Sequence, residues 1–148
     1  MLTDADGREV SRNVYWLSTK PDTLDWSDTT WYYTPVTEYA DLTGLASMAR
    51  VPVAATAVTR VSGGVSTTTV TLRHNGRGTT PALLTDVDVV GAAGRPVLPV
   101  RWSDNQVSLW PGESVTLTAS YRTADLRGSA PSVRIAGWNT PETTVPAA

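Results

Sequence analysis

Short runs of alternating apolar and polar residues fill the chain from Val51 onward. The clearest run spans residues 113–122, and every second position in it is apolar: Val115, Leu117, Ala119 and Tyr121. A period of two is what a β-strand needs when one of its faces is buried and the other is wet. The Pro111-Gly112 pair just before this run is a turn signal. The pattern therefore predicts a half-buried strand that begins after a tight turn.

Further runs, separated by turn residues, predict the remaining strands of a sheet protein. They lie at residues 51–61, 66–73, 83–90, 96–102, 106–109 and 132–138. Gly63-Gly64 favours a hairpin between the first two of these. No apolar stripe with the 3.6-residue period of a helix follows Val51, and Asp41–Met48 is the only helix candidate. About seven short strands in this space predict an all-β, immunoglobulin-like sandwich with an irregular N-terminal extension.

The N-terminal extension repeats a pattern that is found later in the chain. Asp6–Val10 followed by Val14–Trp16 is similar to Ala93–Val97 followed by Val100–Trp102. Each pair predicts a glycine turn and then a strand that ends in tryptophan. The offset is close to the size of one sandwich, so we interpret the first copy as the end of a preceding, related sandwich.

These patterns give an expected division of the chain into four parts. We expect the last hairpin of a preceding sandwich at residues 1–18, an aromatic-rich linker at 19–49, an immunoglobulin-like sandwich at 50–140 and a flexible tail at 141–148.

The composition agrees with a sheet protein and excludes several functions. The chain has 23 Thr and 18 Val, whose β-branched side chains suit strands. A formal charge of −2 with scattered arginines argues against nucleic-acid binding. The absence of Cys excludes disulfides, thiol catalysis and Cys-ligated zinc. No stretch approaches the roughly 20 apolar residues that cross a bilayer.

The titratable residues form no recognisable catalytic, metal or cofactor site. Asp86 and Asp88 alternate along one strand, and we interpret them as solvated charges on its outer face rather than as a glycosidase carboxylate pair. Asp22, Asp25 and Asp28 recur every third residue, but turn formation explains them better than calcium binding. The only histidine, His74, is expected at the surface, at the end of a strand.

The six tryptophans leave the question of binding open. We expect Trp102, Trp110 and Trp138 to pack in or cap the sandwich. A second group lies in the irregular N-terminal segment: Trp26, Trp31, Tyr32 and Tyr33. Its rings either pack against another domain or stack on sugar faces. Coplanar, solvent-open rings on one face would favour sugar binding, whereas buried or scattered rings would favour domain packing.

Several motifs resemble one family of enzymes. Asn13–Ser18, Trp31-Tyr32 and Tyr39–Leu42 resemble the C-terminal region of exo-β-D-glucosaminidases, which belong to glycoside hydrolase family two together with β-mannosidases and endo-β-mannosidases. Residues 97–105, 108–114 and 133–139 are similar to the last immunoglobulin-like domain of that family. The resemblance covers nearly the whole chain and keeps the order of the motifs.

The resemblance implies a non-catalytic part of a larger hydrolase. In this family a (β/α)8 barrel carries the chemistry, and such a barrel needs about 250 residues. We therefore expect a C-terminal accessory module that contacts the other domains of a secreted glycosidase. The glycosidase would act on β-linked glucosaminides or, as second choice, on mannosides, like the mannosylglycoprotein endo-β-mannosidases. The alternative is an autonomous carbohydrate-binding module that holds oligosaccharide on exposed Trp and Tyr. Neither hypothesis involves a metal, cofactor, nucleic acid or membrane.

Overall fold

The computed structural model describes residues 1–147. The chain divides into two compact units, one of residues 1–48 and one that begins at Ala49. This boundary lies one residue before the expected one. In the described part of the chain the helical segments are short 3-10 turns: η1 (Trp26–Asp28), η2 (Thr43–Ser47), η3 (Ala92–Gly94) and η4 (Thr123–Leu126). No helix among these residues is long and apolar enough to span a membrane.

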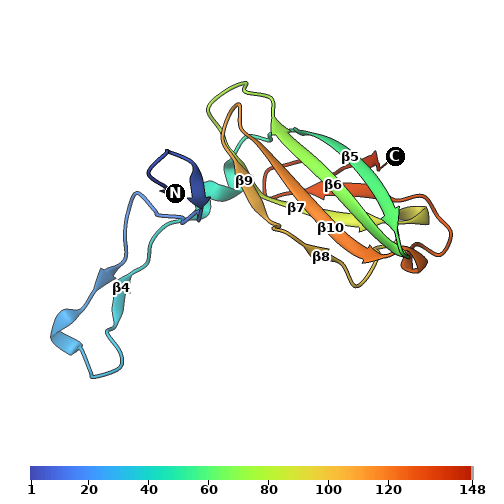
Figure 1. Cartoon of the computed structure of the whole chain (residues 1–148). Coiled ribbons are helices and arrows are strands. Elements are labelled where there is room, and N and C mark those ends of the chain that lie inside the picture. The colour runs from blue at the N-terminus through green and yellow to red at the C-terminus, as the bar shows by residue number, and fades with distance from the viewer. Residues whose placement is uncertain (148) are drawn as a thin grey trace. The chain divides into compact units, whose positions relative to one another are not determined.

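The second unit is a sandwich of two four-stranded antiparallel sheets (Figure 1). The first sheet has the order β5 (Val53–Ser62), β6 (Val65–His74), β10 (Ser114–Arg122), β8 (Arg101–Trp102). The second has the order β12 (Thr143–Pro146), β11 (Ser132–Ala136), β7 (Ala82–Val90), β9 (Val107–Leu109). The predicted all-β class is confirmed. The expected hairpin is also present, because β5 and β6 pair along their full length and Gly63 and Gly64 form the turn with positive φ angles.

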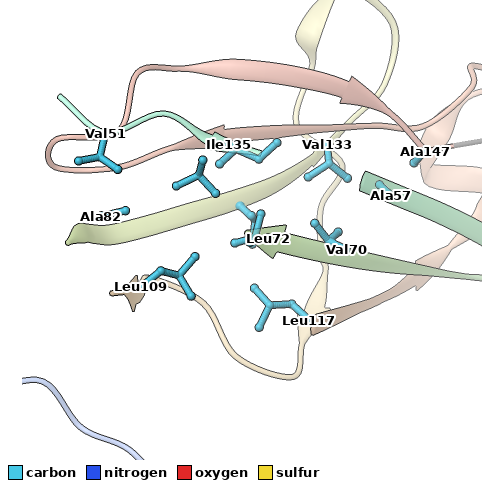
Figure 2. Close-up of a cluster of buried hydrophobic side chains, with 12 residues drawn as sticks. Val51, Ala57, Val70, Leu72, Ala82, Leu109, Leu117, Val133, Ile135 and Ala147 are labelled. Carbon is cyan, nitrogen blue, oxygen red and sulfur yellow. The ribbon is translucent and has the colours of Figure 1, made fainter. Parts of the chain in front are cut away.

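The inward side chains of both sheets meet in a dry core. Figure 2 shows Val70, Leu72 and Leu117 of the first sheet facing Ile135 and its neighbours in the second. Leu72 and Leu117 are no more than 1% exposed. A second cluster surrounds Tyr121, whose hydroxyl shares a 2.9 Å hydrogen bond with Thr68 Oγ1. The period-two pattern of β10 therefore places its apolar face where the sequence predicts it.

Two expected elements differ in the structure. The run at 96–102 becomes a strand only at Arg101–Trp102, preceded by an isolated bridge from Pro96 to Val90. Prolines 96 and 99 lack the N–H that a ladder requires, which limits the strand. The expected flexible tail instead contains β12, which pairs with β11, and Ala147 then forms a parallel bridge with Ala57.

The first unit has hairpins but no hydrophobic core. One hairpin joins β1 (Leu2–Thr3) to β2 (Glu9–Ser11), and the other joins β3 (Thr23–Leu24) to β4 (Val36–Glu38). None of residues 1–48 is buried. The helix candidate at 41–48 forms the 3-10 turn η2. The strands of this unit are short and have no buried face, so burial of a hydrophobic core does not stabilise it.

Candidate functional site

The four aromatic residues singled out in the N-terminal segment lie in one hairpin loop between β3 and β4. Trp26 begins η1, and Trp31, Tyr32 and Tyr33 follow it. Asp25 N–H donates to Pro35 O at 2.9 Å and closes the base of the loop. Thr30 N–H and its hydroxyl both donate to Tyr33 O, at 2.8 and 3.2 Å. The chain therefore brings these four side chains to the tip of one local structure.

These aromatic side chains face solvent, but the ring pair among them is not coplanar. Trp31 is 94% exposed, and Trp26, Tyr32 and Tyr33 are also exposed. The Trp31 and Tyr32 ring centroids lie 4.8 Å apart with an interplanar angle of 71°. This is an edge-to-face pair, and it does not form the flat platform on which a sugar face stacks. The loop thus meets one criterion for sugar binding, solvent exposure, and this pair fails the other.

Other large apolar residues of the first unit are exposed as well. They are Tyr15, Leu17 and Tyr39, each more than three-quarters exposed. Soluble domains rarely leave large apolar patches bare, and such patches mark interaction sites. With no core beneath them, these side chains present their apolar area outward.

Several aspartates of this unit accept backbone hydrogen bonds. Asp25 accepts the Ser27 hydroxyl and backbone N–H, and these hydrogen bonds hold the pKa of its carboxyl below the usual value. Asp41 accepts the same two bonds from Thr43, which lowers its pKa in the same way. Asp22 accepts Ala40 N–H at 2.7 Å. Across residues 1–147 there is no group of three or more His, Asp or Glu that could hold a metal ion.

Asp86 and Asp88 share one face of β7, as predicted, but both are half-buried rather than fully solvated. Asp88 forms an ion pair with Arg134 across the β7–β11 ladder. Burial, and then the charge of Asp88, raise the pKa of the Asp86 carboxyl above its usual value. Asp88 is therefore paired with Arg134, whereas catalysis by a pair of carboxylates would require both to be free.

The raised pKa of Asp86 predicts a pH-dependent effect of Asp86→Asn. Because the folded state favours the protonated carboxyl, ionisation of Asp86 opposes folding above its folded pKa, and this cost disappears below the unfolded pKa. We expect Asp86→Asn to raise the free energy of unfolding at pH 7 by less than about 1 kcal/mol. The gain should vanish near pH 3 in urea titrations. A loss of stability at pH 7 would contradict this assignment.

His74 is fully buried, so its expected surface position is wrong. Its Nδ1 accepts Gly76 N–H at 3.1 Å, and its Nε2 lies 3.0 Å from Thr80 O. Both contacts are satisfied by the neutral ring that carries its proton on Nε2. The buried ring therefore holds two backbone groups of the loop that follows β6.

The loop contacts of His74 predict a stability loss on substitution. His74→Ala should lower the free energy of unfolding by about 2 kcal/mol, because a buried ring is removed and the Gly76 N–H and Thr80 carbonyl lose their partner. His74→Gln, which can still donate toward Thr80 O, should lose less. Urea unfolding of the isolated chain measures both, and equal stability of His74→Ala and the parent sequence would refute the role.

The three sandwich tryptophans have different environments. Trp102 packs against both core clusters, as expected. Trp110 and Trp138 are 42% and 57% exposed, so they do not pack in the core, and of the two expected roles only capping the sandwich is left for them. Trp110 follows β9, which ends at Leu109 as predicted, and Trp138 follows β11, which ends at Ala136, two residues before the predicted end.

Sequence analysis missed Asn139, a buried polar side chain that bonds three other residues of the sandwich. Its Oδ1 accepts Leu83 N–H at 2.9 Å, and its Nδ2 donates to Ala49 O at 3.0 Å and Pro81 O at 2.9 Å. Its own carbonyl accepts Val51 N–H at 2.8 Å. Asn139 therefore joins the start of the sandwich to β7 and β11. A buried Asn among turn residues gives no periodic signal, so the pattern could not reveal it.

Comparison with known proteins identifies the family of this sandwich. A family model described as the exo-β-D-glucosaminidase Ig-fold domain matches residues 31–140. The chain belongs to this exo-β-D-glucosaminidase Ig-fold family. The predicted immunoglobulin-like fold and the stated resemblance are both confirmed.

Curated relatives and a solved structure share nearly the whole chain. It is 70% identical over 149 residues to an exo-β-D-glucosaminidase of Streptomyces avermitilis, covering 100% of this chain and 16% of the relative. An exo-β-D-glucosaminidase of Amycolatopsis orientalis is 61% identical, with 99% and 14% covered. The crystal structure of the Amycolatopsis orientalis exo-chitosanase CsxA matches with a TM-score of 0.86 and 60% identity, over 98% of this chain and 17% of that one. The Ig-fold chain thus spans about one-sixth of the length of the proteins it matches.

Proposed function

We propose that this Ig-fold chain is a non-catalytic accessory module of an exo-β-D-glucosaminidase, and that it holds its place by packing aromatic surface against other domains. The matched relatives carry that enzyme name, which favours glucosaminides over the mannosides that the sequence left open. The catalytic residues of such an enzyme would lie in the five-sixths of its length outside the matched region.

The observation that carries this proposal is the bare aromatic surface of residues 1–48. No residue of this unit is buried, yet it exposes Trp26, Trp31, Tyr32, Tyr33 and other large apolar side chains. A short segment without a core gains little stability on its own. Contact with a larger partner would bury this surface and stabilise the hairpins.

A carbohydrate-binding module remains the second candidate, because Trp31 is almost fully exposed at a loop tip. The edge-to-face geometry of Trp31 and Tyr32 favours packing, since sugar binding requires rings that present one flat face. A catalytic role is not favoured either, because Asp88 is held in a half-buried ion pair with Arg134 and is not a free carboxylate.

Titration of the purified chain with glucosamine oligomers separates the two candidates. Tryptophan fluorescence and calorimetry follow binding, and p-nitrophenyl-β-D-glucosaminide reports activity. The accessory proposal expects neither saturable binding nor hydrolysis by the folded chain. Saturable binding that Trp31→Ala abolishes, while Trp110→Ala leaves it intact, would favour the carbohydrate-binding function. Hydrolysis by the chain alone would contradict both.

We also propose that the module acts outside the cell in carbohydrate breakdown, as the resemblance to exported family-two glycosidases suggests. The test is fractionation of a producing culture with an antibody against this chain. Recovery in the medium supports the proposal, and recovery only from the cytosol contradicts it.

A further inference from the structure

The sandwich carries exposed apolar side chains of its own along the second sheet. We call this group the Leu84 patch, and it consists of Leu84, Trp110 and Trp138, which are 42%, 42% and 57% exposed. No function described above uses these residues. They come from β7 and from the segments that follow β9 and β11.

Backbone hydrogen bonds and strand order place the members of the Leu84 patch on neighbouring segments of the second sheet. Trp138 N–H donates to Leu83 O at 2.9 Å, which sets Trp138 against the bulged part of β7. On the opposite side of β7, Leu84 N–H donates to Ser108 Oγ at 3.2 Å. Val107 and Leu109 pack in the core, so Ser108 between them lies on the other face of β9, and Trp110 directly follows the end of this strand.

A β-bulge presents Leu84 at a conformational cost. The β7–β9 register shifts between Ala82 and Thr85, and Leu84 has a φ of 47°, in the left-handed region. Bulky residues rarely adopt this region, and bulges often re-aim a side chain near functional sites. An isolated sandwich gains no stability from strain at an exposed leucine. The strain therefore points to a contact between Leu84 and another part of the protein.

We propose that the Leu84 patch is a docking surface against which another domain of the same glucosaminidase polypeptide packs. This inference rests on the accessory function proposed above. The matched relatives have most of their length, all but 16% and 14%, outside the region that this chain covers. The patch also adjoins the point where the chain enters the sandwich, because Asn139, next to Trp138, binds Ala49 O.

A sugar fits this surface less well than a protein domain. Ligand sites for small molecules combine apolar walls with several converging polar groups. The Leu84 patch is made of one leucine and two indoles, and of the two carboxylates on β7, Asp88 is already paired with Arg134. Apolar and aromatic side chains with few charges are what the centre of a protein interface contains.

Hydroxyl-radical footprinting with mass spectrometry tests the docking directly. It compares the oxidation rates of Trp110 and Trp138 in the isolated chain and in the full-length glucosaminidase that carries it. Docking predicts a fall of at least about fivefold for both in the full-length enzyme, as for residues at an interface core. Trp102, packed in the sandwich core, is the internal control and should keep its rate.

The other outcomes of footprinting overturn the proposal in distinguishable ways. Protection of Trp31 and Tyr32 without protection of Trp110 and Trp138 would refute this docking surface and leave the accessory function standing. No protection of either group would refute both. Protection that requires added glucosamine oligomers would assign the patch to sugar, and protection in the concentrated isolated chain would assign it to a second copy.

Leu84→Gly gives a second test whose sign differs between the two proteins. Glycine accepts a positive φ without strain, so the midpoint of thermal unfolding of the isolated chain should hold or rise. In the full-length enzyme the lost contact should lower the midpoint for this module by about 2–5 °C. Ala93→Gly is the matched control, because Ala93 is exposed with a φ of 54°, and it should behave alike in both proteins. A parallel response of Leu84→Gly in both proteins would refute docking.

Discussion

Replacing Asn139 with alanine is expected to lower the free energy of unfolding of the chain by about 3–5 kcal/mol, the largest loss for any single polar side chain of the sandwich. The substitution would leave Leu83 N–H and the carbonyls of Ala49 and Pro81 without their partner. Asn139 is only 4% exposed, so water cannot readily replace these bonds. Urea unfolding followed by tryptophan fluorescence measures the loss.

Asn105→Ala is the matched control for Asn139→Ala. Asn105 likewise bonds backbone groups through its side chain: Oδ1 accepts Val87 N–H at 2.9 Å, and Nδ2 donates to Val87 O at 3.0 Å. It is half-buried, so water can solvate the groups it leaves, and we expect a loss of about 1 kcal/mol. Equal losses for the two variants would show that burial does not decide the effect and would contradict the role given to Asn139.

The second large effect is expected for Leu117→Ala in the core. Leu117 is 1% exposed and packs in the larger cluster between the two sheets (Figure 2). Loss of its side chain removes apolar burial and leaves a cavity, which should cost about 3 kcal/mol. The neighbouring Thr118→Ala, on the exposed face of the same strand, should change the stability by no more than about 0.5 kcal/mol. Similar effects at both positions would mean that β10 does not have the burial described here.

Strand positions were predictable where one face of a strand is buried and the other is wet. In β10 the alternation of apolar and polar residues coincides with the buried face. The same signal is absent from β12, in which Val145 is the one partly buried residue and the other three are exposed. That strand depends on pairing with β11 and on the bridge from Ala147 to Ala57, which are contacts distant in sequence.

The candidate site was only partly predictable, because exposure depends on what surrounds a residue. The aromatic cluster was visible from composition, and the structure gathers Trp26, Trp31, Tyr32 and Tyr33 in one loop. Burial of His74 was opposite to expectation, and Trp138, expected to pack in or cap the sandwich, is too exposed for core packing. A polar loop can fold over a histidine, and a strand can stop before a tryptophan, and neither event leaves a periodic pattern. The bulge at Leu84 depends on a positive φ angle, which the presence of a leucine does not predict.

Amide hydrogen exchange of residues 19–48 tests the central claim of an accessory interface most directly. The rates are compared by mass spectrometry between the isolated chain and the full-length glucosaminidase that carries it. In the isolated chain these amides should exchange quickly, because the segment has no buried residue and only short strands. In the full-length enzyme, contact of the aromatic loop with another domain should slow them at least about tenfold. Equal, fast exchange in both proteins would contradict the account, because the bare aromatic surface would then have no partner.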